Sequence, residues 1–249
     1  MIDRPVRSAA DVDRIAPISA AESLSFVGEA IKLARAELAG RTPIIGFAGA
    51  PFTLASYMIE GGGSRQYRNT KTLMYNHPET WDRLMRMLAQ VTSDYLNMQI
   101  ASGADLVQLF DSWVGCLGPD DYRRFVLPYS GAVIRALTPG VPVIHFGTDT
   151  GGLLELIAEA GGDVIGLDWR INLGDAWARL GDGVGVQGNL DPVALFADVA
   201  EIRRRVRVIL DQAGNRPGHI FNLGHGILPE TPVDHAIALV DAVHEMSRR

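Results

Sequence analysis

Several short apolar runs in this sequence are followed by polar side chains and glycines that could do chemistry. His225 stands between two glycines after the run His219–Leu223, where an imidazole can titrate near neutrality and pair with an acidic group; capping of local backbone is the alternative. Ser112 follows the run that ends at Phe110, and serine after aspartate is also common in turns and N-caps. Asp168 is either an acidic residue that takes part in the chemistry of the site or a structural residue that accepts hydrogen bonds from loop amides.

Other site classes find little support. Cys116 is the single cysteine, which excludes a disulfide framework and a multi-cysteine zinc cage and fits a reducing compartment, so we expect a cytoplasmic protein. Gly61–Arg65 resembles a phosphate cradle but lacks the Gly-Lys-Ser/Thr ending of a P-loop. Arg203–Arg205 with Arg207 is typical of a solvated helix face beside acidic residues.

Charge and hydropathy exclude two further classes of partner. The formal net charge of −6 argues against a nucleic-acid-binding protein, which normally presents a basic face. The polar start Met1–Arg7 lacks the apolar core of a signal peptide, and no run approaches the roughly 20 apolar residues of a membrane span. We therefore expect neither export nor insertion into a membrane.

The elements that must position these side chains alternate along the chain. Short runs that are almost entirely apolar indicate strands buried on both faces of a parallel sheet. The six predicted strands are 43–48, 105–110, 142–146, 163–167, 184–187 and 219–223. Predicted helices span 20–38, 78–102, 119–137, 151–160, 191–213 and 231–247. Strands that alternate with helices in this way indicate repeated βαβ units.

Two α/β architectures fit this alternation, an open doubly wound sheet and a (β/α)8 barrel. A polar or glycine-rich cluster follows each predicted strand, and a barrel would bring all of these clusters to one mouth. No Gly-x-Gly-x-x-Gly opens the first helix, so a dinucleotide-binding fold lacks its fingerprint. A chain of 249 residues without a linker or composition break suits one domain.

Five segments in a fixed order carry a resemblance to a known family. They are Gly46-Phe-Ala-Gly-Ala-Pro-Phe-Thr-Leu-Ala-Ser-Tyr57-Met-Ile-Glu-Gly-Gly-Gly63, Leu109-Phe-Asp-Ser112, Gly166-Leu-Asp-Trp169, Gln187-Gly-Asn-Leu-Asp-Pro192 and Asn222-Leu-Gly-His-Gly-Ile227. Together they resemble the uroporphyrinogen decarboxylases. The resemblance implies a homodimeric (β/α)8 barrel that removes the four acetate carboxyls of uroporphyrinogen III to give coproporphyrinogen III in haem biosynthesis. It implies neither a metal nor an organic cofactor.

The resemblance also contains a departure from the family pattern. The N-terminal Arg-Gln-Ala-Gly-Arg-Tyr run of the family and a later Phe-Ser-Asp segment do not occur here. Residues 1–15 look like the stretch that follows these elements. We therefore expect residues 1–249 to form a single barrel domain that lacks its first strands and helices, and we expect the catalytic aspartate of the family to lie in the missing part. No catalytic residue is assigned.

The family motifs map four substrate-binding positions onto this sequence. Tyr57, Ser112 and His225 would hydrogen-bond substrate carboxylates, all three at or just beyond predicted strand ends, and Phe110 would line the cavity. The alternative for Tyr57 is a helix residue whose ring packs inside, and the alternative for Phe110 is plain core.

Three functions remain open. The first is the decarboxylase. The second is a catalytically impaired relative that binds a porphyrinogen or merely dimerises. The third is a corrinoid-dependent methyltransferase, which needs thiol and imidazole ligands for zinc. It ranks last because Cys116 has no histidine two residues before it and His145 is followed by Phe146.

Overall fold

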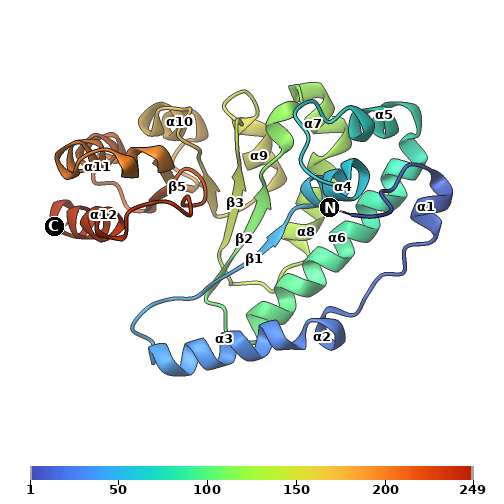
Figure 1. Cartoon of the computed structure of the whole chain (residues 1–249), viewed down its shortest axis with the longest axis horizontal. Coiled ribbons are helices and arrows are strands. Elements are labelled where there is room, and N and C mark those ends of the chain that lie inside the picture. Colours follow the sequence, from blue (N-terminus) through green and yellow to red (C-terminus); the bar gives the residue numbers. More distant parts are fainter. Residues whose placement is uncertain (1, 248–249) are drawn as a thin grey trace.

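All strands of the sheet run parallel, and each is hydrogen-bonded to the strand that follows it in the sequence. The computed structural model describes residues 2–247, and its six-stranded sheet has the order β1-β2-β3-β4-β5-β6 (Figure 1). The strands are β1 (Ile45–Gly49), β2 (Leu106–Asp111), β3 (Val143–Gly147), β4 (Val164–Gly166), β5 (Gly185–Leu190) and β6 (His219–Leu223). All six predicted strands are confirmed.

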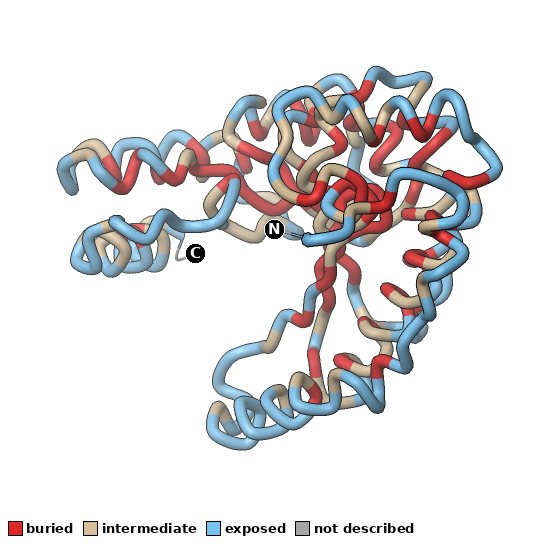
Figure 2. Tube along the Cα trace, turned by 45° about the vertical axis from the view of Figure 1, so that its right-hand side comes forward, coloured by how far each residue is buried: buried red, intermediate tan, exposed pale blue. Residues whose placement is uncertain are grey.

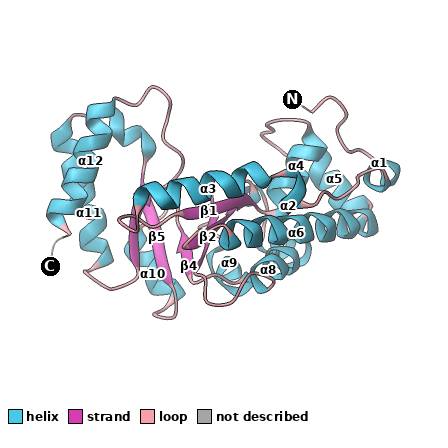
Figure 3. Cartoon of the chain, turned by 90° about the horizontal axis from the view of Figure 1, so that it is seen from below, coloured by secondary structure: helices cyan, strands magenta, loops and turns pink. Residues whose placement is uncertain are grey.

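The connections between strands are helical. The helices are α1 (Ala9–Asp13), α2 (Ala20–Ser23), α3 (Ser25–Leu38), α4 (Pro51–Glu60), α5 (Arg68–Asn76), α6 (Pro78–Ala101), α7 (Pro119–Phe125), α8 (Leu127–Arg135), α9 (Leu154–Ala160), α10 (Leu173–Leu180), α11 (Val199–Ala213) and α12 (Val233–Met246), with short 3-10 turns η1 (Val114–Cys116) and η2 (Pro192–Phe196). Helices α11 and α12 pack together at one end of the molecule, while α1, α4 and α5 gather at the other (Figure 3).

Three of the long predicted helices are divided in the structure. The one predicted over 191–213 is the 3-10 turn η2 followed by α11, with extended backbone at Ala197 and Asp198 between them, and two others are each two α-helices. The helix predicted over 119–137 breaks at Val126, whose backbone leaves helical geometry (φ −127°, ψ −53°). Pro128 then stands in the first turn of α8, where proline is favoured because it lacks a backbone N–H. The helix predicted over 20–38 breaks at Leu24 (φ −124°, ψ 23°), and both of its pieces contact α6.

The sheet separates two sets of side chains. Val107 and Leu109 of β2 point outward and are fully buried against helical residues such as Leu96 of α6 and Val133 of α8. Phe110 points the opposite way, because successive side chains of a strand alternate between faces. Buried segments therefore concentrate along the strands and on the helix sides that face them (Figure 2).

The aromatic anchor of the outer layer is Trp81 of α6. Its side chain is 1% exposed, its ring contacts that of Phe52 edge to face at 6.0 Å, and its indole Nε1 donates to the carbonyl oxygen of Phe125 at 2.9 Å. A buried tryptophan normally needs such a partner for its N–H. The contact ties α6 to α4 and to the end of α7.

The arrangement corresponds to six consecutive units of a (β/α)8 barrel, as the sequence predicts. Within residues 2–247, β1 and β6 each pair with a strand on one side only. Apolar side chains are exposed near these edges, including Phe47 of β1, which is 60% exposed, and Val233 and Ile237 of α12. Over the same residues, no helix has the length and apolar character needed to cross a bilayer.

An unpaired strand edge beside exposed apolar side chains favours association between copies. We expect sedimentation velocity to show concentration-dependent association of the chain, and we expect Phe47→Lys to shift the distribution toward monomer because a charge on an edge strand opposes edge-to-edge pairing. Phe47→Leu keeps the apolar character and serves as the control. A monodisperse wild-type monomer with a single sharp thermal transition would contradict this prediction.

Candidate functional site

A cavity of about 460 Å³ lies at the carboxyl ends of the strands. Residues of β2, β3 and β6 and of the segments that follow β2 and β6 form its wall, together with one residue of β5. The lining residues are Gln108, Phe110, Ser112, Phe146, Gln187, Asn222, Leu223, His225, Gly226 and Ile227. Three of the four residues singled out from the sequence, Phe110, Ser112 and His225, therefore lie around one cavity.

An aromatic row forms one wall of the cavity. The rings of Phe110 and Phe146 meet edge to face with their centroids 5.7 Å apart, and Phe47 contacts Phe110 in the same way at 5.7 Å. Such pairs hold their relative orientation better than aliphatic contacts do. The row gives the cavity a rigid apolar side that suits the face of a planar ring.

Two glutamines form a neutral polar part of the lining. Gln187 Nε2 donates to Gln108 Oε1 at 3.1 Å, and both side chains are nearly fully buried. Gln187 Oε1 has no hydrogen-bond partner among the described residues, which is costly for a buried acceptor. Sequence reasoning missed this pair, although a glutamine inside each of two apolar strand runs was a usable signal.

Glycine allows the loop that carries His225 to approach its neighbours closely. A Cβ on Gly224 would lie 2.6 Å from the backbone nitrogen of Trp169, and the Gly224 N–H donates to the carbonyl oxygen of Leu190 at 2.7 Å. The loop after β6 is thus fixed against the ends of β4 and β5. His225 itself is exposed, so its imidazole is accessible to a ligand at the rim.

The structure corrects the predicted position of Tyr57. Tyr57 does not lie at a strand end, because Pro51 starts helix α4 directly after β1 and carries Tyr57 into the second turn of that helix. Its ring stacks on Trp113 with centroids 3.8 Å apart and an interplanar angle of 36°, and the residue is 44% exposed. Tyr57 lies outside the cavity wall and next to the segment that contains Ser112.

Asp168 holds the loops after β3 and β4 in place. Its carboxylate accepts from the backbone N–H groups of Asp149 at 2.7 Å and Arg170 at 3.1 Å, and it pairs with the Arg170 guanidinium at 2.5 Å. The side chain is 2% exposed. Of the two alternatives from the sequence, these contacts support the structural one.

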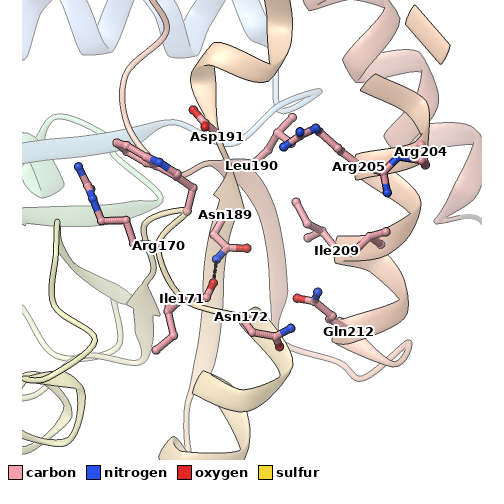
Figure 4. A pocket seen from close by; sticks show the side chains of 12 residues that line it. Arg170, Ile171, Asn172, Asn189, Leu190, Asp191, Arg204, Arg205, Ile209 and Gln212 are labelled. Atoms are coloured by element: carbon pink, nitrogen blue, oxygen red, sulfur yellow. Dashed lines mark hydrogen bonds between the residues drawn. The ribbon is translucent and has the colours of Figure 1, made fainter. Parts of the chain in front are cut away.

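A second cavity, of about 380 Å³, lies outside the sheet between α11 and the ends of β4 and β5 (Figure 4). Arg204 and Arg205 line it, and both guanidinium groups bond Glu201. Asn189 crosses the base of this cavity and donates to the carbonyl oxygens of Asp168 and Ile171 at 2.9 and 2.7 Å. The guanidinium groups of Arg204 and Arg205 in this cavity therefore already form intramolecular bonds to Glu201, as expected for the basic cluster on α11.

The described part of the chain contains no group of three or more His, Cys, Asp or Glu side chains placed to hold a metal ion. His145 is fully buried, and its Nδ1 lies 3.2 Å from the carbonyl oxygen of Gly161. Burial lowers the pKa of this imidazole to about 4. His145 is thus a neutral core residue.

Comparison with known proteins supplies the family. The family model described as uroporphyrinogen decarboxylase matches residues 1–246. Curated proteins of that name from Carboxydothermus hydrogenoformans and Sorangium cellulosum are 57% and 54% identical to this chain; the alignments cover 99% and 100% of the chain and 71% of each relative.

Solved structures extend the comparison of folds. A methyltransferase from Methanosarcina mazei superposes with a TM-score of 0.83 at 19% identity, covering 95% of this chain and 69% of that protein. A B12-independent methionine synthase from Shewanella sp. W3-18-1 has a TM-score of 0.64 at 12% identity, over 88% of this chain and 65% of that protein. Identities this low establish a shared fold and nothing more.

The contacts of Asp168 lead to a stability prediction. Asp168→Ala leaves two loop amides and one guanidinium without their acceptor, so we expect a loss of about 3 kcal/mol in the free energy of unfolding, measured by urea denaturation. Asp182→Ala, at an exposed loop position, is the control and should change stability by less than about 0.5 kcal/mol. Equal effects of the two substitutions would show that Asp168 does not fasten these loops.

Proposed function

Because this chain belongs to the uroporphyrinogen decarboxylase family, we propose that it removes the four acetate carboxyls of uroporphyrinogen III to give coproporphyrinogen III. The observation that carries this proposal is the identity of 57% and 54% to curated decarboxylases, which extends over essentially the whole chain. The cavity at the strand ends, with an aromatic wall and hydrogen-bonding groups at its rim, supports it.

The chemistry explains what such a site must provide. An acetate on a pyrrole loses CO2 readily only when the electron pair of the breaking C–C bond has an acceptor. Protonation of a pyrrole ring carbon creates that acceptor. The C–C bond to the carboxyl group then breaks, CO2 leaves, and the electron pair of that bond neutralises the ring cation. The remaining CH2 group takes up a proton and becomes the methyl group of the product, and the proton on the ring carbon leaves. The site must hold the pyrrole in one pose and deliver protons.

The residues around the cavity divide this work. The aromatic row of Phe110 and Phe146 contacts ring faces, and the amides of Gln108 and Gln187 supply neutral hydrogen-bonding groups deeper in the cavity. Ser112 and His225 bind substrate carboxylates at the rim, where hydrogen bonds to a charged acceptor are strong. Tyr57 approaches the same carboxylates from α4. We assign no proton donor among the described residues.

A second candidate function is binding of a porphyrinogen without turnover. One observation favours it. The described residues that line the cavity include no aspartate or glutamate, whose carboxylate could stabilise a pyrrole cation. In either case we propose a cytoplasmic protein with residues 1–249 as one domain. We also propose a homodimer, supported by the exposed apolar residues Val233, Ile237 and Val240 on one face of α12.

Anaerobic incubation with uroporphyrinogen III separates the two functions. We expect chromatography of the oxidised reaction mixture to show porphyrins with seven, six, five and four carboxyls appearing in turn. Saturable binding of the porphyrinogen without these products would support the second function. If the chain neither bound the porphyrinogen nor formed product, both functions would be contradicted.

The proposed role of His225 predicts a loss of transition-state binding. His225→Ala removes a hydrogen bond to a substrate carboxylate, so kcat/KM for the first decarboxylation should fall about 10- to 100-fold. His244→Ala, on the exposed side of α12, is the matched control and should leave kcat/KM within about twofold, as expected for a surface change. Unchanged kinetics in His225→Ala would remove this residue from the site.

The two interpretations of Tyr57 predict different outcomes for two substitutions. Tyr57→Phe keeps the stack on Trp113 but removes the hydroxyl, so a carboxylate-binding role predicts an increase in KM of about tenfold. If only the ring matters, Tyr57→Phe will match wild type and Tyr57→Ala alone will be impaired. Steady-state kinetics on both variants decides between them, and we expect the first outcome.

A further inference from the structure

Asp111 is the last residue of β2 and lies between two residues of the proposed site. Phe110 and Ser112 line the cavity on the inner face, whereas the Asp111 side chain belongs to the outer face, between the sheet and its helices. It is 0% exposed. A buried carboxyl at this position is costly unless its hydrogen bonds do something for the structure or the site.

The carboxyl group makes two hydrogen bonds with hydroxyl groups from different helices. Thr53 Oγ1, in the first turn of α4, donates to Oδ1 at 3.2 Å, and Ser130 Oγ, in α8, donates to Oδ2 at 3.2 Å. Both hydroxyl residues are buried. Among the described residues, no lysine, arginine or histidine forms an ion pair with Asp111, so two neutral donors are all that compensates its burial.

Helix α4 connects Asp111 to the substrate-facing surface. Tyr57 lies one turn after Thr53 in α4, and its ring stacks on Trp113. Trp113 follows Ser112, which follows Asp111 in the chain. The hydrogen bond from Thr53 to Asp111 therefore closes a ring of contacts that fixes Ser112 and Tyr57 relative to each other.

We propose that Asp111 is a positioning residue, which sets the geometry of Ser112 and Tyr57 by fastening α4 to the end of β2, and that its protonation state controls substrate affinity. This inference rests on the proposed function. An ionised carboxylate accepts from both hydroxyls. A neutral carboxyl has one O–H donor, so one of the two hydroxyls must accept instead and redirect its own hydrogen. The two forms thus hold α4 differently.

The electrostatic surroundings support a change of form at an accessible pH. Burial raises the pKa of Asp111 to about 7, and the bonds from Thr53 and Ser130 only partly oppose this shift. The titratable groups that face it are Tyr122 of α7, which is buried, and Cys116 of η1, whose thiol pKa burial raises to about 11. Lys71 of α5 donates to the Cys116 carbonyl oxygen at 2.5 Å, and its charge opposes the effect of burial on the thiol pKa.

The kinetic test compares wild type with Asp111→Asn between pH 5.5 and 8.5. Asparagine keeps one acceptor oxygen and replaces the other by an NH2 donor group, and it cannot titrate. We expect KM of the wild type to change with an inflection near pH 7, and we expect this inflection to vanish in Asp111→Asn while kcat stays within threefold. An inflection that belongs to another group would persist in the variant and would overturn the proposal.

A second variant shifts the inflection without removing the carboxyl. Thr53→Val is close to isosteric and deletes one bond that lowers the Asp111 pKa, so the inflection should move to higher pH. Asp82→Asn is the matched control, because Asp82 also accepts from a hydroxyl, that of Tyr129 at 2.8 Å, but lies away from the cavity in α6. It should leave the inflection in place.

A readout that needs no turnover separates failure of this inference from failure of the proposed function. The tryptophan fluorescence of the protein should change around pH 7 in wild type, and this change should be absent in Asp111→Asn and in Trp113→Phe, which lacks the responding ring. The free energy of unfolding should also depend on pH. Because the pKa of Asp111 is higher in the folded state than the ordinary 3.8, the folded state binds the proton more tightly, and wild type should lose stability relative to Asp111→Asn as pH rises from about 4 to about 7. A flat difference in stability together with unchanged fluorescence would overturn the proposal, whether or not the chain turns over substrate.

Discussion

The parallel register of the six strands is the constraint on which the rest of the structure depends. Each strand is hydrogen-bonded to its successor in the chain, so every connection must return across the sheet, and it does so through helices. The carboxyl ends consequently meet at one edge. Within β2, the alternation of side chains directs Phe110 toward the cavity and Leu109 and Asp111 toward the helices. A one-residue shift in the register of β2 would turn Phe110 toward the helices and Leu109 and Asp111 toward the cavity. The packing of the buried outer layer therefore also determines which side chains line the cavity.

The strands could be predicted from the sequence because the apolar runs are short and buried on both faces. Helix boundaries were harder, since the break at Val126 depends on how α7 and α8 pack and not on the amphipathic pattern alone. Helix α4 was missed because Pro51-Phe-Thr53 looks like a polar cluster after a strand. Proline at the first helical position was the available signal.

In the site too, the local sequence places single residues, whereas contacts between residues far apart in the chain appear only in the structure. Ser112 and His225 line the cavity, as expected for polar residues just after strand ends in a parallel fold, whereas their assigned roles come from the family motifs. The pair of Gln108 and Gln187 joins positions 79 residues apart in the sequence, and the bond from Thr53 to Asp111 joins positions 58 apart. Such pairings depend on tertiary structure. A glutamine inside each of two apolar strand runs was a local signal for Gln108 and Gln187, but it could not show that the two side chains meet. Motif resemblance assigned roles to residues but did not show that Tyr57 contacts Trp113.

We propose that a tetrapyrrole binds at the strand ends between the aromatic row and the rim residues. The most direct test is a crystal structure of the chain with coproporphyrinogen III or its oxidised porphyrin. We expect pyrrole rings against Phe110 and Phe146, with carboxylates within hydrogen-bonding distance of Ser112 and His225. A ligand in the outer cavity between α11 and the ends of β4 and β5, with the inner cavity unchanged, would contradict it.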